Sequence, residues 1–243
     1  MIDALRRLLN RLPLVEHLSI QLVVGLAISL VCLGIFGALA DEVGEQETMV
    51  EIDVALANAL HAEATPLSTD IFILISWIGM PGLWLLGVGV GLLFLLRREF
   101  LHLAIWVAAL AGGTLLNTLL KLIFARPRPV FVEPLVIEQN FSFPSGHAMQ
   151  SLIAFGLFAY FLWHSVQNRS ARILIVFAAV LLIVLIGISR MTLGVHYLSD
   201  VIAGFAAGGL WLAACITALD TLERRRQRGD LQAQQGDDTS PAV

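Results

Sequence analysis

Six stretches of 17 to 26 residues contain no Asp, Glu, Lys or Arg, and they limit the possible folds more than any other feature. They are Leu18–Ala40, Ile71–Leu96, Phe100–Leu120, Ala148–Asn168, Ile173–Ser189 and Val201–Leu219. A helix of about 20 apolar residues, rising about 1.5 Å each, crosses the hydrocarbon core of a bilayer. The chain is 58% hydrophobic and only 14% charged, which is too apolar for a water-soluble fold. We therefore predict an all-α, polytopic membrane protein with a six-transmembrane-helix bundle.

Other classes of protein fit the sequence poorly. The apolar runs lack the alternation of barrel strands, and unpaired strands cannot face lipid. The formal net charge is −4 and the basic residues are scattered, so we expect no nucleic-acid partner. Cys32 and Cys215 both lie inside apolar runs, which leaves no disulfide framework or Cys-rich metal site. We expect no metal and no cofactor, and the oligomeric state stays open.

The orientation follows from Lys and Arg, which concentrate in cytoplasmic loops. Six crossings place eleven of the fifteen cations on the side of both termini: Arg6, Arg7, Arg11, Arg97, Arg98, Arg169, Arg172, Arg224, Arg225, Arg226 and Arg228. The other four, Lys121, Arg126, Arg128 and Arg190, fall on the outer side and need a separate reason. We predict a cytoplasmic segment over residues 1–17, a membrane domain over 18–220 and a disordered cytoplasmic tail over 221–243. An uncleaved first helix is favoured over a secretory signal, whose apolar core is shorter.

Two segments are expected to be irregular. The sequence Gly79-Met80-Pro81-Gly82 interrupts the second run and should kink the helix or split it. In residues 50–60, Ile52, Leu56 and Leu60 recur every four residues, which predicts a short amphipathic helix. This helix either lies on the outer membrane surface or caps the bundle. The acidic loop around it carries no recognisable site.

Polar residues gather at two helix ends on the predicted outer side. Lys121 follows Asn117 by one turn, so both can face the bundle interior, and Arg126-Pro127-Arg128-Pro129 comes next. Alone, this segment fits a lipid-headgroup anchor. In Pro144-Ser145-Gly146-His147, Ser145 is a candidate N-cap, Gly146 lets backbone N–H groups approach an anion, and His147 lies on the first turn. Alone, this segment fits an ordinary helix cap.

A third segment joins the last two runs and carries His196 and Asp200, four residues apart. At this spacing a carboxylate can accept the imidazole N–H and make the other ring nitrogen a better base or nucleophile, although the pair could also merely cap a helix. Lys121, Arg128 and Arg190, with no evident matching acids, surround two histidines on one membrane face. This combination predicts a phosphoryl-transfer site that needs no metal.

The three segments also resemble the motifs of a known family. Lys121-x6-Arg128-Pro129, Pro144-Ser145-Gly146-His147 and Ser189-Arg190-x3-Gly194-x-His196-x3-Asp200 match the pattern of the type 2 phosphatidic acid phosphatase and vanadium haloperoxidase superfamily. The resemblance implies that His196 is the nucleophile, Asp200 its orienting partner and His147 the general acid. It implies that the phosphate is held by Lys121, Arg128, Arg190, Ser145 and Gly146. Arg126 is not a motif position and is expected to be an auxiliary contact, useful to a diphosphate.

The expected function is a metal-independent lipid phosphatase that works through a phosphohistidine at the outer face of a bacterial inner (plasma) membrane. Its lipid phosphate substrate is expected among undecaprenyl diphosphate, phosphatidylglycerophosphate and phosphatidate, with the polyprenyl diphosphate preferred. Haloperoxidases of the superfamily are soluble, which argues against that branch. The alternative is a transporter, whose polar site would lie near the membrane midplane.

Overall fold

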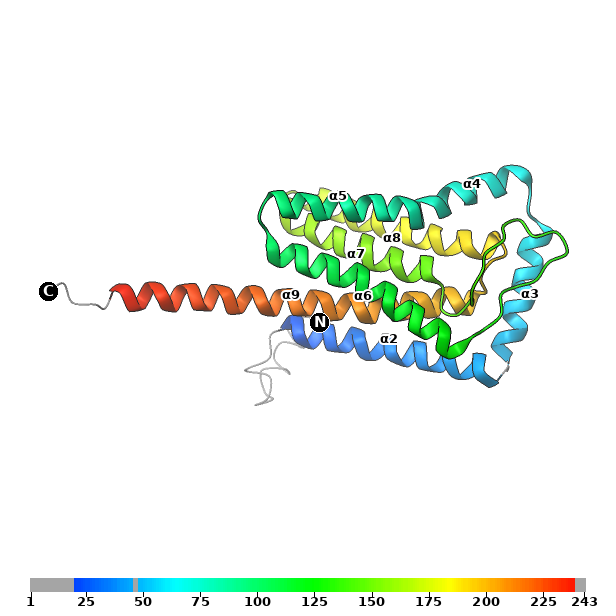
Figure 1. The fold of residues 1–243 in the computed structure, drawn as a ribbon, viewed down its shortest axis with the longest axis horizontal. Helices are drawn as coiled ribbons and strands as arrows, with labels where there is room; N and C mark the ends of the chain where they lie inside the picture. Colours follow the sequence, from blue (N-terminus) through cyan, green and yellow to red (C-terminus); the bar gives the residue numbers. More distant parts are fainter. Residues whose placement is uncertain (1–19, 46–47, 239–243) are drawn as a thin grey trace.

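The computed structural model describes residues 20–45 and 48–238, and these residues form helices joined by loops, without strands. The elements are α2 (Ile20–Glu45), α3 (Thr48–Ala62), α4 (Pro66–Trp77), the π-helical turn η1 (Ile78–Gly82), α5 (Leu83–Leu96), α6 (Phe100–Phe124), α7 (Gly146–Ser165), α8 (Arg169–Thr192) and α9 (Leu198–Asp238). The long helices run side by side, and α3 crosses one end of the bundle (Figure 1). The all-α prediction is confirmed.

The number of candidate membrane spans differs from the six expected. Five described segments are long and apolar enough to cross a membrane: Leu22–Gly44, Pro66–Leu96, Phe100–Phe124, Arg169–Thr192 and Leu198–Gln227. Helix α7, the expected fourth span, is not among them, so the six-span count stays a prediction. The reason is its position: α7 packs against α6, α8 and α9 and buries polar Gln150 and Ser151 against protein. A helix surrounded by protein needs less apolar surface than one facing lipid.

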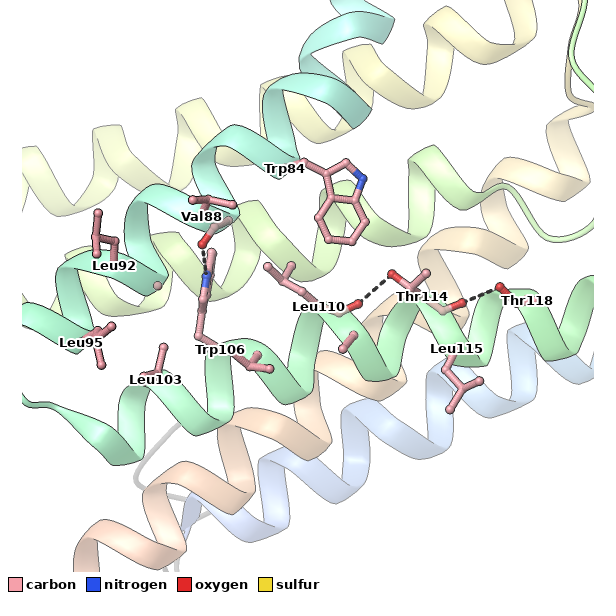
Figure 2. A pocket seen from close by; sticks show the side chains of 14 residues that line it. Trp84, Val88, Leu92, Leu95, Leu103, Trp106, Leu110, Thr114, Leu115 and Thr118 are labelled. Carbon is pink, nitrogen blue, oxygen red and sulfur yellow. Dashed lines mark hydrogen bonds between the residues drawn. The ribbon is translucent and has the colours of Figure 1, made fainter.

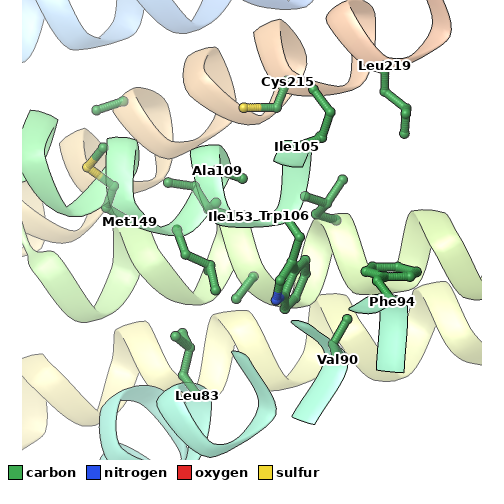
Figure 3. Packing of buried hydrophobic residues seen from close by; sticks show 14 residues of the cluster. Leu83, Val90, Phe94, Ile105, Trp106, Ala109, Met149, Ile153, Cys215 and Leu219 are labelled. Carbon is green, nitrogen blue, oxygen red and sulfur yellow. The ribbon is translucent and has the colours of Figure 1, made fainter. Parts of the chain in front are cut away.

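Close packing holds α7 in the middle of the bundle. A Cβ atom added at Gly204 would lie 2.6 Å from the carbonyl oxygen of Ser145, and one at Gly208 would lie 2.8 Å from that of Met149. Only glycine lets the two backbones approach this closely, as expected for small residues between membrane helices. On the other side of α7, Trp106 is buried in the apolar cluster of Figure 3 and donates its indole N–H to Gly87 over 2.9 Å.

The two irregular segments differ in detail from the expectation. The interruption at Gly79–Gly82 is a π-helical turn that contains Pro81 and joins α4 to α5 within one span. Helix α3 contacts α2, α8 and α9, which supports the cap interpretation. The face that it packs against the bundle is not the apolar one, because Ile52 is 48% exposed whereas Asp53 and Ala57 are buried.

The C-terminal segment also differs from the prediction of a disordered tail from residue 221. Helix α9 continues to Asp238 (Figure 1). The sequence from 222 to 228 is rich in Leu, Glu, Arg and Gln, which favour helix even without packing partners. The expected cytoplasmic segment 1–17 and residues 239–243 lie outside the described residues.

Candidate active site

The three motif segments meet at one end of the bundle, where α6 ends, α7 begins and α8 turns into α9 (Figure 1). They surround a cavity of about 340 Å³. The expected site residues that line it are Lys121, Arg128, Gly146, His147 and His196. The other three, Ser145, Arg190 and Asp200, are buried next to these. A polar site at the helix ends does not match the midplane site of a transporter.

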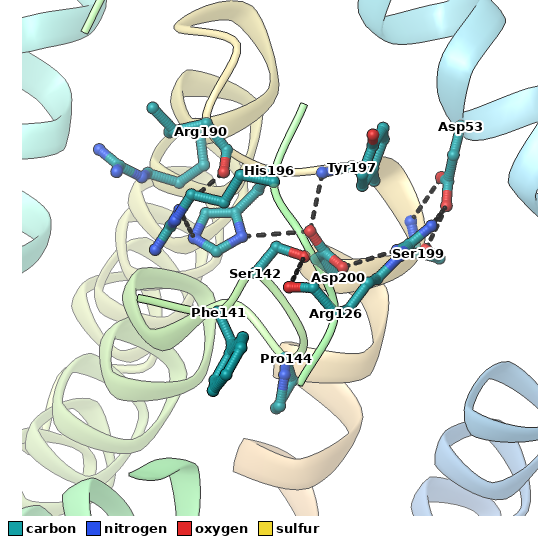
Figure 4. Close-up of polar contacts among 12 residues, drawn as sticks. Asp53, Arg126, Phe141, Ser142, Pro144, Arg190, His196, Tyr197, Ser199 and Asp200 are labelled. Atoms are coloured by element: carbon teal, nitrogen blue, oxygen red, sulfur yellow. Dashed lines mark hydrogen bonds and ion pairs between the residues drawn. The ribbon is translucent and has the colours of Figure 1, made fainter. Parts of the chain in front are cut away.

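His196 lies in the turn between α8 and α9, with Asp200 one turn into α9. Its Nδ1 is 3.2 Å from Oδ2 of Asp200, which also accepts the backbone N–H of Tyr197 over 2.9 Å (Figure 4). Its Nε2 is 3.1 Å from a guanidinium nitrogen of Arg128. Because a carboxylate can only accept from Nδ1 and a guanidinium can only donate to Nε2, these partners assign the proton to Nδ1. Nε2 therefore carries the unprotonated lone pair and lies at the cavity, where it accepts a hydrogen bond from Arg128.

The electrostatic environment keeps His196 neutral. Burial lowers the pKa of its imidazole well below the ordinary value, and the positive charges of Arg128, Arg190 and Lys121 lower it further. The side chain is 2% exposed. Neutral imidazole is the form that can act as a nucleophile, so the site favours the reactive state.

The start of α7 provides donors at the same cavity. Ser145 is the N-cap residue, but its side chain forms no cap hydrogen bond, and its buried Oγ has no partner among the described residues. A Cβ atom on Gly146 would lie 3.0 Å from Oδ1 of Asn117, so a larger residue would crowd this helix start. His147 follows in the first turn and lines the cavity. This end of α7 can bind an anion through its free backbone N–H groups.

Three cations surround the cavity, each held by a fixed neighbour. Lys121 donates to the carbonyl oxygen of Phe141, and Arg128 donates to those of Asn140 and Val195 over 3.0 and 2.7 Å. Arg190 is 2% exposed and donates to Ser76 of α4. Its Nε has no partner among the described residues. The cations are therefore held in place before any substrate binds.

The expectation that these cations lack matching acids is wrong. The carboxylate of Glu138, in the α6–α7 loop, pairs with Arg190 and lies 3.1 Å from Arg128. Burial alone would raise its pKa, but the attraction of Arg190 and Arg128 outweighs this and lowers it. Glu138 thus neutralises part of the positive charge of Arg128 and Arg190 at the cavity. Its loop position gave no periodicity from which this contact could be inferred.

The expectation that Arg126 contacts the phosphate is also wrong. Its guanidinium is 8% exposed and lies 2.7 Å from Oδ1 of Asp200 and 2.8 Å from Oδ2 of Asp53 (Figure 4). It also donates to Ser199 over 2.8 Å. Sequence reasoning missed Asp53 entirely. The available signal was its spacing to Ala57, which puts an acid on the small-residue face of α3.

Comparison with known proteins agrees with this fold and site. The family model described as the PAP2 superfamily matches residues 102–224, which include all three motif segments. The chain belongs to the PAP2 superfamily and is a membrane phosphatase of that family.

Its relatives include Phosphatidylglycerophosphatase B of Bacillus subtilis (strain 168), which is 35% identical over 186 residues, covering 72% of this chain and 87% of that protein. The crystal structure of a transmembrane PAP2-type phosphatidylglycerolphosphate phosphatase from Bacillus subtilis superposes with a TM-score of 0.68 at 29% identity. The superposition covers 81% of this chain and 96% of the Bacillus subtilis chain. Aquifex aeolicus LpxE shares the fold at a TM-score of 0.54 and 22% identity, over 68% of this chain and 95% of its own.

Proposed function

We propose that this protein is a metal-independent lipid phosphatase that forms a phosphohistidine on Nε2 of His196. The observation that carries the proposal is the position of this nitrogen. It faces a cavity lined by Lys121 and Arg128, with Arg190 buried next to it, while Nδ1 is held by Asp200. The three cations supply the positive charge that a metal ion supplies in other phosphatases.

The reaction divides into two transfers. The phosphate displaces Glu138 from Arg128 and Arg190 and accepts hydrogen bonds from Ser145 and the start of α7. Nε2 of His196 then forms a bond to phosphorus as the P–O bond to the lipid breaks, and His147 donates a proton to the leaving oxygen. Asp200 stabilises the positive imidazole ring. Water, deprotonated by His147, finally attacks the phosphohistidine, releases phosphate and restores neutral His196.

A lipid substrate is supported by a groove beside the polar cavity. The groove has a volume of about 800 Å³ and lies between α5 and α6, with a lining that is almost entirely apolar (Figure 2). Trp84, Val88 and Leu115 line it, and Thr118 at its end also lines the polar cavity. An acyl or prenyl chain in this groove would therefore hold its phosphate beside Lys121, one turn further along α6.

The engagement of Arg126 changes the order of the candidate substrates. Arg126 is the extra cation that a diphosphate could use, but this guanidinium is bound by two buried carboxylates. Without it, the cations at the cavity favour a single phosphate group. We therefore propose a phosphatidylglycerophosphate-like phosphomonoester first, in line with the name of the relative from Bacillus subtilis, and phosphatidate and undecaprenyl diphosphate after it.

We also propose that the site faces the outer side of a bacterial inner membrane. The four cations that run against the cytoplasmic bias of Lys and Arg have local roles. Arg126 and Arg190 pair with buried or half-buried acids, Arg128 contacts His196, and Lys121 caps a loop carbonyl. The remaining eleven then follow the rule, with the termini in the cytoplasm.

The test is phosphate release by the purified full-length protein in detergent, with His196→Ala to measure contaminating activity. The panel consists of phosphatidylglycerophosphate, phosphatidate, undecaprenyl diphosphate and water-soluble glycerol 3-phosphate, each with and without EDTA. We expect the lipids to be cleaved far faster than glycerol 3-phosphate and EDTA to have no effect. No release from any lipid, or activity lost to EDTA and restored by a divalent metal, would contradict the proposal.

A further inference from the structure

A buried row of charged groups leads from the cap helix α3 to the proposed nucleophile. Asp53 of α3 binds Arg126 over 2.8 Å, Arg126 binds Asp200 over 2.7 Å, and Asp200 binds His196 over 3.2 Å (Figure 4). Asp53 and Asp200 are fully buried and Arg126 nearly so. These groups come from three separate parts of the chain. The arrangement therefore depends on tertiary structure, and the first member lies outside the three motifs.

The two carboxylates in this row compensate the positive charge of Arg126, and this affects the negative charge that Asp200 presents to His196. An isolated Arg126 beside Asp200 would cancel much of the negative charge that Asp200 must direct at the imidazole. Asp53 lies on the far side of the guanidinium and compensates its positive charge. Burial alone would lower the pKa of Arg126, but the two carboxylates together raise it, so the guanidinium stays charged. Buried ion pairs of this kind need every member, because one missing partner leaves an uncompensated charge.

Asp53 also fixes the start of α9, the helix that carries Asp200. Its Oδ1 accepts the backbone N–H of Ser199 over 3.0 Å, and its Oδ2 accepts the hydroxyl of the same residue. Ser199 lies in the first turn of α9, where backbone N–H groups have no partner within the helix. Asp53 thus contacts Arg126, which binds the Asp200 carboxylate, and Ser199, which directly precedes Asp200 in the chain.

We propose that Asp53 is a positioning residue for the phosphatase reaction, which holds Arg126 and Ser199 so that Asp200 keeps its orientation and negative charge toward His196. The proposal rests on the proposed function, since it assigns a role in phosphoryl transfer. Asp53 does not line the cavity and so does not touch the substrate. Its effect therefore belongs to the transition state, in which His196 becomes positively charged, rather than to binding of the phosphate.

The test is the isosteric variant Asp53→Asn in the full-length enzyme, assayed with the best lipid substrate. We expect kcat to fall about tenfold or more, with KM within about twofold of wild type. The inhibition constant of orthovanadate, which imitates the transition state on the histidine, should rise with the loss of kcat. The inhibition constant of inorganic phosphate should not change. Both constants are measured on the folded fraction, so a lower yield does not alter them.

Three variants complete the experiment. Glu51→Gln removes an exposed acid from the same helix and should behave as wild type. Asp53→Glu retains the charge and should recover most of the kcat lost in Asp53→Asn. If Asp53→Asn yields no folded protein, the smaller neutral variant Asp53→Ser takes its place, and a vanadate inhibition constant raised more than the phosphate constant then supports the proposal. Adding Asp53→Asn to Arg126→Gln should lower kcat by a smaller factor than Asp53→Asn does alone, because the part of its effect that passes through Arg126 is already lost.

The outcomes separate this proposal from the proposed function. An inactive wild-type enzyme would overturn the proposed function itself. An active wild type together with unchanged kcat and vanadate inhibition in Asp53→Asn would overturn only the role of Asp53. Equal increases in the vanadate and phosphate constants would also overturn it, because they indicate a general loss of the anion site.

Discussion

A guanidinium nitrogen of Arg128 lies 3.1 Å from Nε2 of His196, the nitrogen proposed to attack phosphorus. This contact brings a phosphate oxygen bound by Arg128 close to the nucleophile. It also disfavours a second proton on the imidazole, because that proton would face a positive charge. In the proposed mechanism, the same arginine would serve both substrate binding and the protonation state of the nucleophile.

The first prediction concerns pH. Burial and the nearby cations lower the pKa of His196 well below its ordinary value of 6.5, so the neutral form persists into mildly acidic solution. We expect kcat/KM, corrected for ionisation of the substrate phosphate, to remain high below this pH and to fall only as His196 becomes protonated. A pH series for wild type checks this. A fall in the corrected kcat/KM that begins at or above pH 6.5 as the solution is acidified would contradict it.

The second prediction concerns the histidine and its partner. His196→Ala removes the nucleophile and should reduce kcat by at least about 100-fold, whereas Asp200→Asn removes an orienting charge and should leave measurable activity. His102→Ala is the matched control, because His102 pairs with Glu223 and does not line the cavity. Rates are measured as phosphate release. Near-normal turnover in His196→Ala would exclude the phosphohistidine mechanism.

The third prediction concerns inhibition. Orthovanadate can adopt the five-coordinate geometry of the phosphoryl transition state on Nε2 of His196. It should therefore inhibit more tightly than inorganic phosphate, with or without EDTA. The comparison requires inhibition constants for both anions under the same conditions. If phosphate inhibits as well as vanadate, the site is not organised around a covalent transition state.

The fourth prediction concerns Glu138, which competes with phosphate for Arg128 and Arg190. Glu138→Gln removes the competing charge and should lower the inhibition constant of inorganic phosphate several-fold, by analogy with charged hydrogen bonds worth about 1.5–3 kcal/mol. Glu133→Gln in the same loop is the control, since Glu133 does not line the cavity. Weaker phosphate binding in Glu138→Gln would mean that Glu138 organises the cations rather than competes for them.

The fifth prediction concerns sidedness. A chain lacking Cys32 and Cys215 and carrying Val132→Cys has its single thiol at a fully exposed loop position beside the site. An impermeant maleimide should label it in intact cells. The matched Ser170→Cys chain places an exposed thiol at the start of α8, at the opposite end, and should react only after the membrane is opened. The reverse pattern would place the site in the cytoplasm.

Much of the fold followed from local features of the sequence. Charge-free runs are enough to predict most helices, because burial of apolar side chains in lipid requires little knowledge of their neighbours. Helix α7 was harder to interpret. Its composition reflects contacts with α6, α8 and α9, and polar Gln150 depends on Thr114 and Leu110 of α6 for hydrogen bonds. Whether such a helix counts as a span depends on tertiary packing that no local window contains.

The contacts in the site also divide into those that local spacing predicts and those that depend on tertiary structure. His196 and Asp200 could be paired from the sequence because one helical turn separates them. The partners of Arg126 could not, since Asp53 lies 73 residues away, on a helix whose apolar spacing draws attention to Ile52 instead. Glu138 likewise reaches Arg190 across 52 residues of chain. Long-range ion pairs of this type follow from the topology of the chain rather than from spacing.

Asp200 serves two motifs through different atoms: its carboxylate orients His196, and its backbone carbonyl accepts the N–H of Ser145 over 2.9 Å. Ser145, which precedes α7, and His196 are therefore both hydrogen-bonded to the same residue. A small rotation of the α9 terminus would carry both in the same direction and preserve their separation. Thermal motion of the α9 terminus would then move Ser145 and His196 together and leave the distance between them unchanged.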